Sequence, residues 1–210
     1  MINFTRLHKD RIDFVKNNQN DDHVILNGDN KVLISAPHGV NQVRLGKLKY
    51  KEIGSLAVAL YLRNNTNSFL IAKTKNNYDD ANFDENCKYR KSIERIVKQQ
   101  KIKYLLDIHG LSAKRNIDVN FGVHLGDNIK TNPKQFEKLN GQLINSGFAV
   151  SIDKPFMAGA KTISGSIKKK FGDIFTLQIE INCGITNQIE NEKRFIKLLD
   201  ILSDWINELS

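Results

Sequence analysis

The sequence predicts an α/β sandwich, and three features of the chain support this class. Strand-like apolar runs alternate with longer amphipathic stretches along the chain. Several of these runs are continuously apolar and rich in β-branched residues, which is typical of strands buried on both faces of a sheet. No Pro-, Gly- or Ser-rich linker divides the 210 residues, so we expect a single domain over residues 1–210.

The composition excludes several other classes. The chain is 40% hydrophobic and 26% charged, which is typical of a folded protein and not of a disordered one. No apolar run approaches the roughly 18 residues of a membrane span, so we expect no membrane partner. The segment Met1–Val15 is charged throughout and has no signal-peptide core, which favours a cytoplasmic location. Cys87 and Cys183 are too few for a disulfide framework.

The elements can be assigned in order along the chain. In the first thirty residues, Ile12–Val15 and His23–Leu26 are expected to form a small hairpin around Asn17–Asp22. Six further apolar runs are predicted strands: Lys31–Ala36, Ser68–Lys75, Tyr104–Ile108, Ile117–Leu125, Phe148–Ile152 and Ile174–Ile181.

Four segments have the spacing of amphipathic helices: Tyr50–Asn64, Glu85–Lys101, Pro133–Ser146 and Gln188–Leu209. The third begins with a proline after Asn132 and ends before Gly147, which are helix start and stop signals. The last has Phe195, Leu199 and Leu202 at near-heptad spacing.

Two of the predicted strands end in the dipeptide His-Gly, at His38-Gly39 and His109-Gly110. In open α/β sheets, ligands bind just beyond the carboxyl ends of the strands. The following glycine lets the backbone turn sharply and leaves the imidazole accessible. Each histidine alone could simply cap a strand or pack in the core, but the matched pair favours convergence on one metal ion.

Glu52 and Glu180 are the carboxylates that could complete such a site. A catalytic zinc site needs a third protein ligand, and Glu52 lies in the first turn of the helix predicted after the His38 loop. Its alternative role is a carboxylate stabilised by the helix dipole. Glu180 is a lone carboxylate inside an apolar strand, which predicts either a salt bridge with Lys or Arg or a role as general base.

Other polar segments surround these residues. The stretch Asp79–Asp84 follows a predicted strand, and such acidic and amide clusters are commonly plain turns. Arg44 and Arg90 could present forked donors to a substrate carboxylate, although surface solvation is the ordinary explanation for any one arginine.

Taken in order, these segments resemble the N-formylglutamate amidohydrolase family, within the carboxypeptidase-A-like zinc hydrolases. The resemblance covers roughly residues 30–185. The matching segments are Ala36-Pro37-His38-Gly39, Glu52, Asp80-Ala81-Asn82, Leu106-Asp107-Ile108-His109-Gly110, Asp118 with Gly122, Lys154-Pro155-Phe156 with Gly159, and Gln178-Ile179-Glu180-Ile181-Asn182.

The resemblance implies a three-layer α/β/α sandwich with a mixed, mostly parallel sheet, and amide hydrolysis by water activated on one zinc ion. His38, Glu52 and His109 would hold the zinc, and Glu180 would be the general base. Arg44 would stabilise the oxyanion, while Asp80, Asn82 and Arg90 would contact the substrate.

Two positions depart from the family pattern: the first bears on Glu52 as a metal ligand, and the second widens the choice of substrate. Asn41 stands where a His-x-x-Glu pair would place its acid, and Phe83 stands where an arginine would follow Asn82. The expected substrate is a small molecule or short peptide with a carboxylate, such as an N-formyl or N-acyl glutamate. The alternative is a zinc exopeptidase or amidase acting on an acidic peptide or a cell-wall fragment.

Nucleic-acid binding is the competing function from another class. The net charge is +9, and Lys168–Lys170 form a basic run that we expect in a solvated loop. Nucleic-acid binders usually interleave aromatic residues with the cations, but only 8% of this chain is aromatic and no such interleaving occurs. We therefore expect no nucleic-acid partner.

Overall fold

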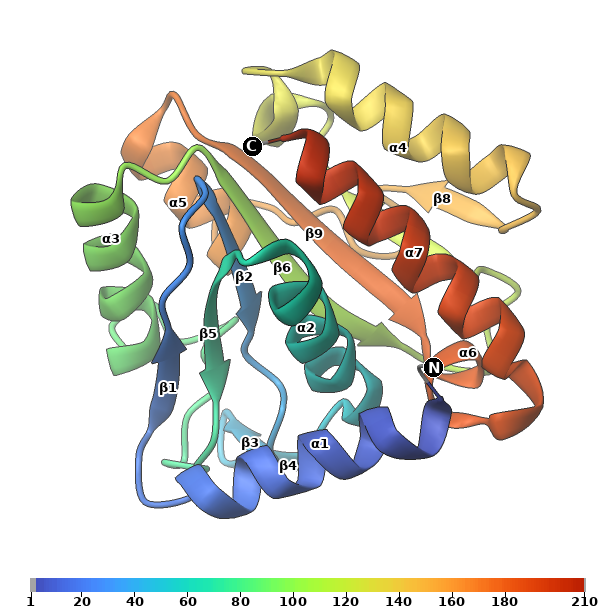
Figure 1. The fold of residues 1–210 in the computed structure, drawn as a ribbon. Helices are drawn as coiled ribbons and strands as arrows, with labels where there is room; N and C mark the ends of the chain where they lie inside the picture. Colours follow the sequence, from blue (N-terminus) through green and yellow to red (C-terminus); the bar gives the residue numbers. More distant parts are fainter. Residues whose placement is uncertain (1–2, 210) are drawn as a thin grey trace.

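The computed structural model describes residues 3–209, and a seven-stranded sheet runs through its centre (Figure 1). The strands lie in the order β1-β5-β2-β6-β9-β7-β8. Their bounds are β1 (His23–Leu26), β2 (Val32–Ala36), β5 (Phe69–Lys73), β6 (Tyr104–Leu111), β7 (Val119–Gly122), β8 (Val150–Ile152) and β9 (Phe175–Asn182).

The sheet is mixed and mostly parallel, as expected. The four central strands β5, β2, β6 and β9 are parallel to one another. β1 joins β5 antiparallel at one edge, and β7 joins β9 antiparallel toward the other, where β8 lies parallel to β7. The carboxyl ends of β2, β6 and β9 therefore meet at one end of the sheet, where ligands bind in such folds.

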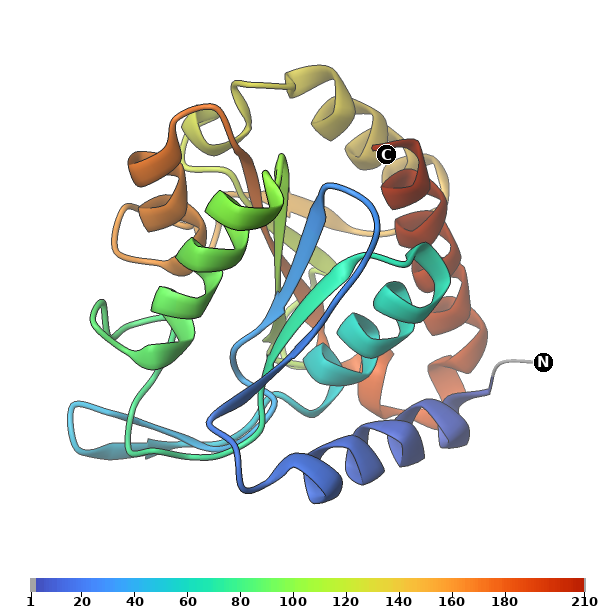
Figure 2. The ribbon, with the colours of Figure 1, turned by 60° about the vertical axis from the view of Figure 1, so that its left-hand side comes forward.

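Helices cover both faces and make the three layers (Figure 2). One face packs against α2 (Ile53–Thr66), α4 (Pro133–Asn145) and α7 (Glu192–Glu208), with α1 (Phe4–Asn18) lying against α2. The other face packs against α3 (Lys88–Gln100) and α5 (Ile163–Phe171). The short helix α6 (Cys183–Asn187) follows β9 directly, and two 3₁₀ turns cover Asp127–Ile129 and Ile189–Asn191.

The expected hairpin at the start of the chain is wrong, because residues 4–18 form helix α1. The Asn3 side chain accepts a hydrogen bond from the Arg6 N–H at 2.8 Å and caps the helix. Leu7 and Arg11, four residues apart, are the buried positions of α1. The second half of the expected hairpin, His23–Leu26, does form a strand, β1. It pairs with β5 and not with Ile12–Val15. Residues 1 and 2 lie outside the described part.

The basic run was expected in a loop, but Lys168–Lys170 form the last turn of α5. Lys168 is buried, and its ammonium donates to the carbonyl oxygens of Gly172 at 2.6 Å and Ile174 at 2.8 Å. One cation of the run is thus used to hold the turn between α5 and β9. Cations at the end of a helix also match the helix dipole.

The predicted strand Ile117–Leu125 is shorter than expected. β7 ends at Gly122 because the Asp153 carboxylate binds the next three backbone N–H groups, those of Val123, His124 and Leu125. These bonds replace pairing within the sheet. His124 and Leu125 then adopt positive φ angles of 50° and 55°, which no strand can contain.

A two-stranded hairpin that the sequence did not indicate stands beside the carboxyl end of the sheet. It consists of β3 (Gln42–Arg44) and β4 (Lys47–Lys49), which pair antiparallel. Leu45 and Gly46 form its turn with φ angles of 51° and 73°, the positive values that a tight hairpin turn requires. Among residues 3–209, no helix has the length and apolar character needed to cross a membrane.

Candidate metal centre

A cavity of about 550 Å³ opens where β2, β6 and β9 end. Its walls come from segments that are distant in sequence, including the β3–β4 hairpin, the start of α2 and the loop before α5. The side chains that matter for chemistry are His38, Arg44, Lys49, Glu52, Asn82, His109, Arg115, Lys161, Gln178 and Glu180.

His38 lies at the end of the β2 segment and is almost fully buried. Its Nε2 lies 2.9 Å from Asp80 Oδ1, and its Nδ1 lies 2.8 Å from Glu52 Oε1. A buried carboxylate behind one ring nitrogen fixes the orientation of the ring and directs the other nitrogen outward. His38 Nδ1 is therefore the atom offered to a ligand.

His109 is held in the same way from the neighbouring strand β6. Its Nε2 lies 3.1 Å from Asp107 Oδ2, two residues earlier on the same face of the strand. Its Nδ1 lies 3.1 Å from His38 Nδ1 and 3.4 Å from Glu52 Oε2. Burial disfavours the charged ring, but Asp107 and Glu52 outweigh this effect and hold the pKa of His109 well above its ordinary value.

Glu52 precedes α2 and brings its carboxylate back over the strand ends. Its Oε2 accepts a hydrogen bond from the Gly110 N–H at 2.8 Å. A Cβ at position 110 would lie 3.1 Å from Glu52 Cβ and 3.3 Å from Cγ, which is closer than ordinary contact, so glycine lets Glu52 approach without a shift. Burial would raise the pKa of Glu52, but the charges and hydrogen bonds of His38 and His109 lower it well below the ordinary value.

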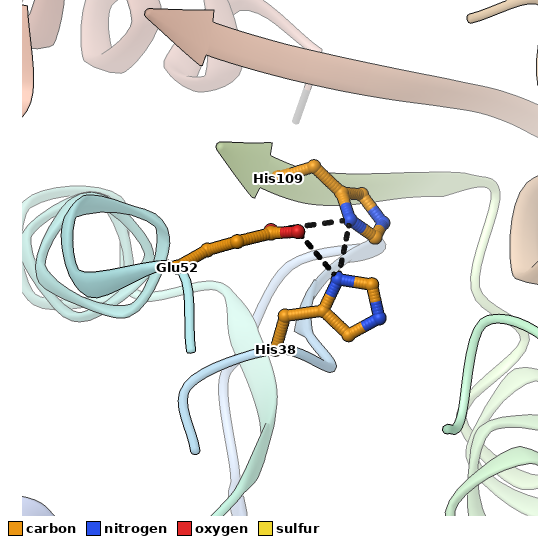
Figure 3. Close-up of side chains that lie close together, drawn as sticks. All are labelled: His38, Glu52 and His109. Atoms are coloured by element: carbon orange, nitrogen blue, oxygen red, sulfur yellow. Dashed lines mark hydrogen bonds and ion pairs between the residues drawn. The ribbon is translucent and has the colours of Figure 1, made fainter. Parts of the chain in front are cut away.

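Three lone-pair donors thus converge in one place, as Figure 3 shows. Ligand atoms of His38, Glu52 and His109 all lie within 4.8 Å of one another. The contacts among them are 2.8 Å from His38 Nδ1 to Glu52 Oε1, 3.1 Å between the two Nδ1 atoms and 3.4 Å from His109 Nδ1 to Glu52 Oε2. These distances are close to the roughly 3.3 Å separation of neighbouring ligands in a tetrahedral zinc site. Two imidazoles and a carboxylate are also a donor set that zinc accepts, so these residues fit a metal ion.

Glu180 lies on β9 opposite His109 and is only 5% exposed. Its Oε1 accepts a hydrogen bond from Gln178 Nε2 at 2.6 Å. Burial raises the pKa of Glu180 to about 7; nearby His109 lowers it and Glu52 raises it. A carboxyl group with a pKa near neutrality can both accept and release a proton under physiological conditions.

The salt bridge considered for Glu180 does not form. Within residues 3–209, Glu180 has no Lys or Arg ion-pair partner. Its polar contact is the neutral amide of Gln178. Among residues 3–209, the positive charge that lowers the pKa of this carboxyl group comes from His109 and His38 and not from Lys or Arg.

The residues expected to contact substrate fall into two groups. Asn82 lines the cavity, and its Oδ1 also accepts from the Ile163 N–H at 2.9 Å. Asp80 is fully buried behind His38. Burial would raise its pKa, but the hydrogen bond and charge of His38, with the charges of Lys49 and Arg44, hold it well below the ordinary range. Asp80 therefore does not face the cavity. It supports a ring of the triad.

Arg90, which was expected to contact substrate, is buried and is not among the residues that line the cavity. Nε donates to the Ala81 carbonyl at 2.7 Å, Nη2 to the Lys161 carbonyl at 2.6 Å and Nη1 to Ser166 Oγ at 3.2 Å. Each of its three guanidinium nitrogens thus donates to another segment of the protein, and the side chain joins these segments. Arg44 does line the cavity, with Nε and Nη2 on Asp80 Oδ2 at 2.9 and 2.7 Å.

Sequence reasoning missed Asp107, Lys49, Arg115 and Lys161. Asp107 had a detectable signal, because a carboxylate two residues before a strand histidine shares its face. Lys49 lies on a hairpin that the sequence did not indicate, and Arg115 and Lys161 come from loops. Their meeting at one cavity depends on tertiary contacts that have no local pattern.

Sequence comparison finds no match, either to a known protein family or to a curated protein. Comparison with solved structures does find matches. N-formylglutamate amidohydrolase from Ralstonia eutropha JMP134 shares 11% identity at a TM-score of 0.60, over 90% of this chain and 96% of that chain. A bacteriophage poly-gamma-glutamate hydrolase shares 14% identity at a TM-score of 0.55, over 94% and 95% of the two chains.

A third similar structure is the zinc-free form of a protein named YNDL. It shares 15% identity at a TM-score of 0.51, over 91% of this chain and 93% of that chain. At these identities the likeness establishes the fold alone. It confirms the three-layer α/β/α architecture that the resemblance in the sequence implied.

Proposed function

We propose that this protein is a metal-dependent amidohydrolase that cleaves an amide bond in a small acid or short peptide bearing a carboxylate. The observation that carries the proposal is the convergence of His38, Glu52 and His109 beside the buried Glu180, at the mouth of one cavity. A metal triad next to a carboxyl group of raised pKa is the arrangement that hydrolysis by activated water requires.

One zinc ion is the metal that we propose, with His38 Nδ1, His109 Nδ1 and Glu52 as its protein ligands. A catalytic zinc site has three protein ligands and one open position, where the ion lowers the pKa of water and polarises a carbonyl group. Asp80 and Asp107 keep the two imidazoles in the orientation that faces the ion. The zinc-free form reported for YNDL is consistent with such a site in this fold.

Glu180 is the proposed general base and then general acid. It takes a proton from the attacking water and returns it to the departing amine, so the proton count balances over the reaction. Gln178 orients its carboxyl group through the 2.6 Å hydrogen bond. Arg44 stands over Phe83 with its guanidinium carbon 5.1 Å from the ring centroid, and it lines the same cavity as the triad. Its proposed role is to stabilise the developing oxyanion with its positive charge.

The charges around the cavity support an acidic substrate. Arg44, Lys49, Arg115 and Lys161 line it, while its carboxylates are Glu52 and Glu180 of the reaction centre itself. Arg115 and Lys161 are exposed and form no ion pair within residues 3–209, so they are available to a substrate carboxylate. Forked arginine donors in particular match a carboxylate.

Two substrate classes satisfy this charge pattern. One is an N-formyl or N-acyl glutamate, as in the amidohydrolase from Ralstonia eutropha. The other is an acidic peptide or cell-wall fragment, and poly-gamma-glutamate is the substrate named for the bacteriophage relative. The volume of about 550 Å³ and the 41% exposure of both Phe156 and Met157 at the rim leave room for more than one residue, which supports the second class.

A substrate panel tests the proposal. The zinc-loaded protein is assayed for amine release from N-formylglutamate, from γ-glutamyl-glutamate, and from the matching glutamine compounds that lack the side-chain charge. We expect turnover of at least one acidic compound and at least tenfold lower kcat/KM for its glutamine analogue, which lacks the side-chain carboxylate. No turnover of any compound by protein that holds zinc would contradict the amidohydrolase proposal.

A further inference from the structure

Lys49 holds its ammonium group against the proposed metal ligands. It is the last residue of β4 and lies on the inner face of the hairpin, where it pairs with Gln42 and shares the face with Arg44. Its Nζ lies 3.3 Å from His38 Nδ1 and 3.4 Å from Glu52 Oε1. Two of the three atoms that would bind a metal ion are therefore in contact with a lysine of the same chain.

These contacts use the lone pairs that a metal ion needs. In the neutral ring that binds a metal, we assign the N–H of His38 to Nε2 because Asp80 accepts from it at 2.9 Å. The 2.8 Å contact between His38 Nδ1 and Glu52 Oε1 is a hydrogen bond while Nδ1 carries a proton, but in the metal-binding form of the ring it joins two acceptors. Two acceptors this close are stabilised by a cation beside them, and the Lys49 ammonium supplies one with three donor hydrogens.

We propose that Lys49 is an internal competitor of the metal ion at the His38–Glu52–His109 triad. The ammonium and the divalent ion draw on the same lone pairs and repel each other, so the metal enters only as the Lys49 side chain leaves. The metal affinity of the site is therefore lowered by Lys49 and depends on the β3–β4 hairpin that carries it. This inference rests on the metal centre in the proposed function.

The Lys49 side chain can move away from the triad without disturbing the core. The Lys49 side chain is 34% exposed, and the neighbouring strand residues Lys47 and Leu48 are exposed as well. β3 and β4 form their own two-stranded sheet, separate from the central seven strands. A change of the lysine rotamer therefore needs no change in the sheet that holds His38 and His109.

The test measures zinc affinity by competition with a chromogenic chelator, starting from protein stripped of metal. We expect the Lys49→Met variant to bind zinc at least about tenfold more tightly than the wild type, and Lys49→Gln to change in the same direction. Lys49→Arg, which keeps the charge, should stay within about threefold of the wild type. Lys47→Met removes a lysine from the same strand but not from the triad, and it should leave the affinity unchanged.

Equal or weaker zinc binding by both Lys49→Met and Lys49→Gln would overturn the competition. The metal centre itself is tested separately with His109→Ala. If that variant binds zinc as well as the wild type does, the triad is not the binding site and both proposals fail. If His109→Ala loses zinc and the two Lys49 variants do not tighten it, the role of Lys49 alone is wrong.

Discussion

His109 and Glu180 stand opposite each other on the neighbouring parallel strands β6 and β9. This register brings a proposed metal ligand and the proposed base to the same end of the sheet, although they are far apart in sequence. Glu180 gains no ion pair in exchange for its burial within residues 3–209. A buried carboxylate without a Lys or Arg partner costs stability, which is typical of a residue retained for chemistry.

The stability of the zinc-stripped protein should therefore fall as the pH rises. The pKa of Glu180 lies near 7 in the folded protein and near 4.5 without burial, so folding favours the neutral form. The resulting loss of stability develops between these two values and is complete above pH 7. The gap corresponds to a loss of about 3 kcal/mol at most.

The Glu180→Gln variant tests whether Glu180 causes this loss of stability with rising pH, because the amide keeps the shape of the side chain and has no charge to bury. Denaturant unfolding of zinc-stripped protein should show the variant more stable than the wild type at pH 8, by about 1–3 kcal/mol, and nearly equal at pH 4.5. A variant that is less stable than the wild type at pH 8 would show that the carboxylate is a structural partner.

Removal of one triad ligand should remove the metal. His109→Ala leaves His38 and Glu52, which is too few protein ligands to compete with water for zinc. We expect about one zinc per wild-type chain and less than a tenth of that in the variant, measured by elemental analysis after dialysis. His124→Ala is the control, since that histidine lies outside the cavity and should keep the full zinc content.

Gly110→Ala should weaken zinc binding through Glu52. The added Cβ meets the Glu52 side chain at 3.1 and 3.3 Å and displaces its carboxylate. We expect about a 10–100-fold loss of zinc affinity, the range found when support of a ligand is lost. Gly141→Ala is the control. Gly141 lies in α4, and a Cβ there would have nothing within 4 Å. This variant should keep the zinc affinity and gain up to about 1 kcal/mol of stability.

Added salt separates the hydrolase from the nucleic-acid binder. Hydrolysis of a small acidic amide should lose less than about tenfold in kcat/KM in 0.3 M NaCl, since a few short-range contacts hold the substrate. A nucleic-acid complex would lose orders of magnitude in affinity because it depends on counterion release. Tight, salt-sensitive binding of random DNA without amide hydrolysis would reverse our assignment.

The sequence was informative where function follows from local pattern. His38 and His109 each follow an apolar strand and precede a glycine, and Glu180 interrupts an apolar run. In a parallel sheet these strand ends must meet at one edge, so three residues that are far apart could be assigned to one site. The alternation of strand-like and helix-like segments predicted the α/β class, and the family resemblance implied its three layers.

The sequence was uninformative where the role of a side chain depends on partners that the fold brings to it. Arg90 resembled a surface or substrate-binding arginine, but three acceptors contributed by Ala81, Lys161 and Ser166 bury its guanidinium. Lys168 resembled a solvated lysine, but two carbonyl groups of the following turn bind its ammonium. No local pattern marks such acceptors, because the fold brings them into place.

Turnover by the zinc-loaded Glu180→Gln variant tests the account most directly. Gln178 can still donate to the new amide oxygen, so the fold and the zinc content should be retained. The amide cannot accept the proton of the attacking water, so kcat on an acidic amide should fall by about 10²–10⁴-fold. A variant that keeps its zinc and hydrolyses the substrate at the wild-type rate would contradict the assignment of Glu180 as the base, and with it the proposed mechanism.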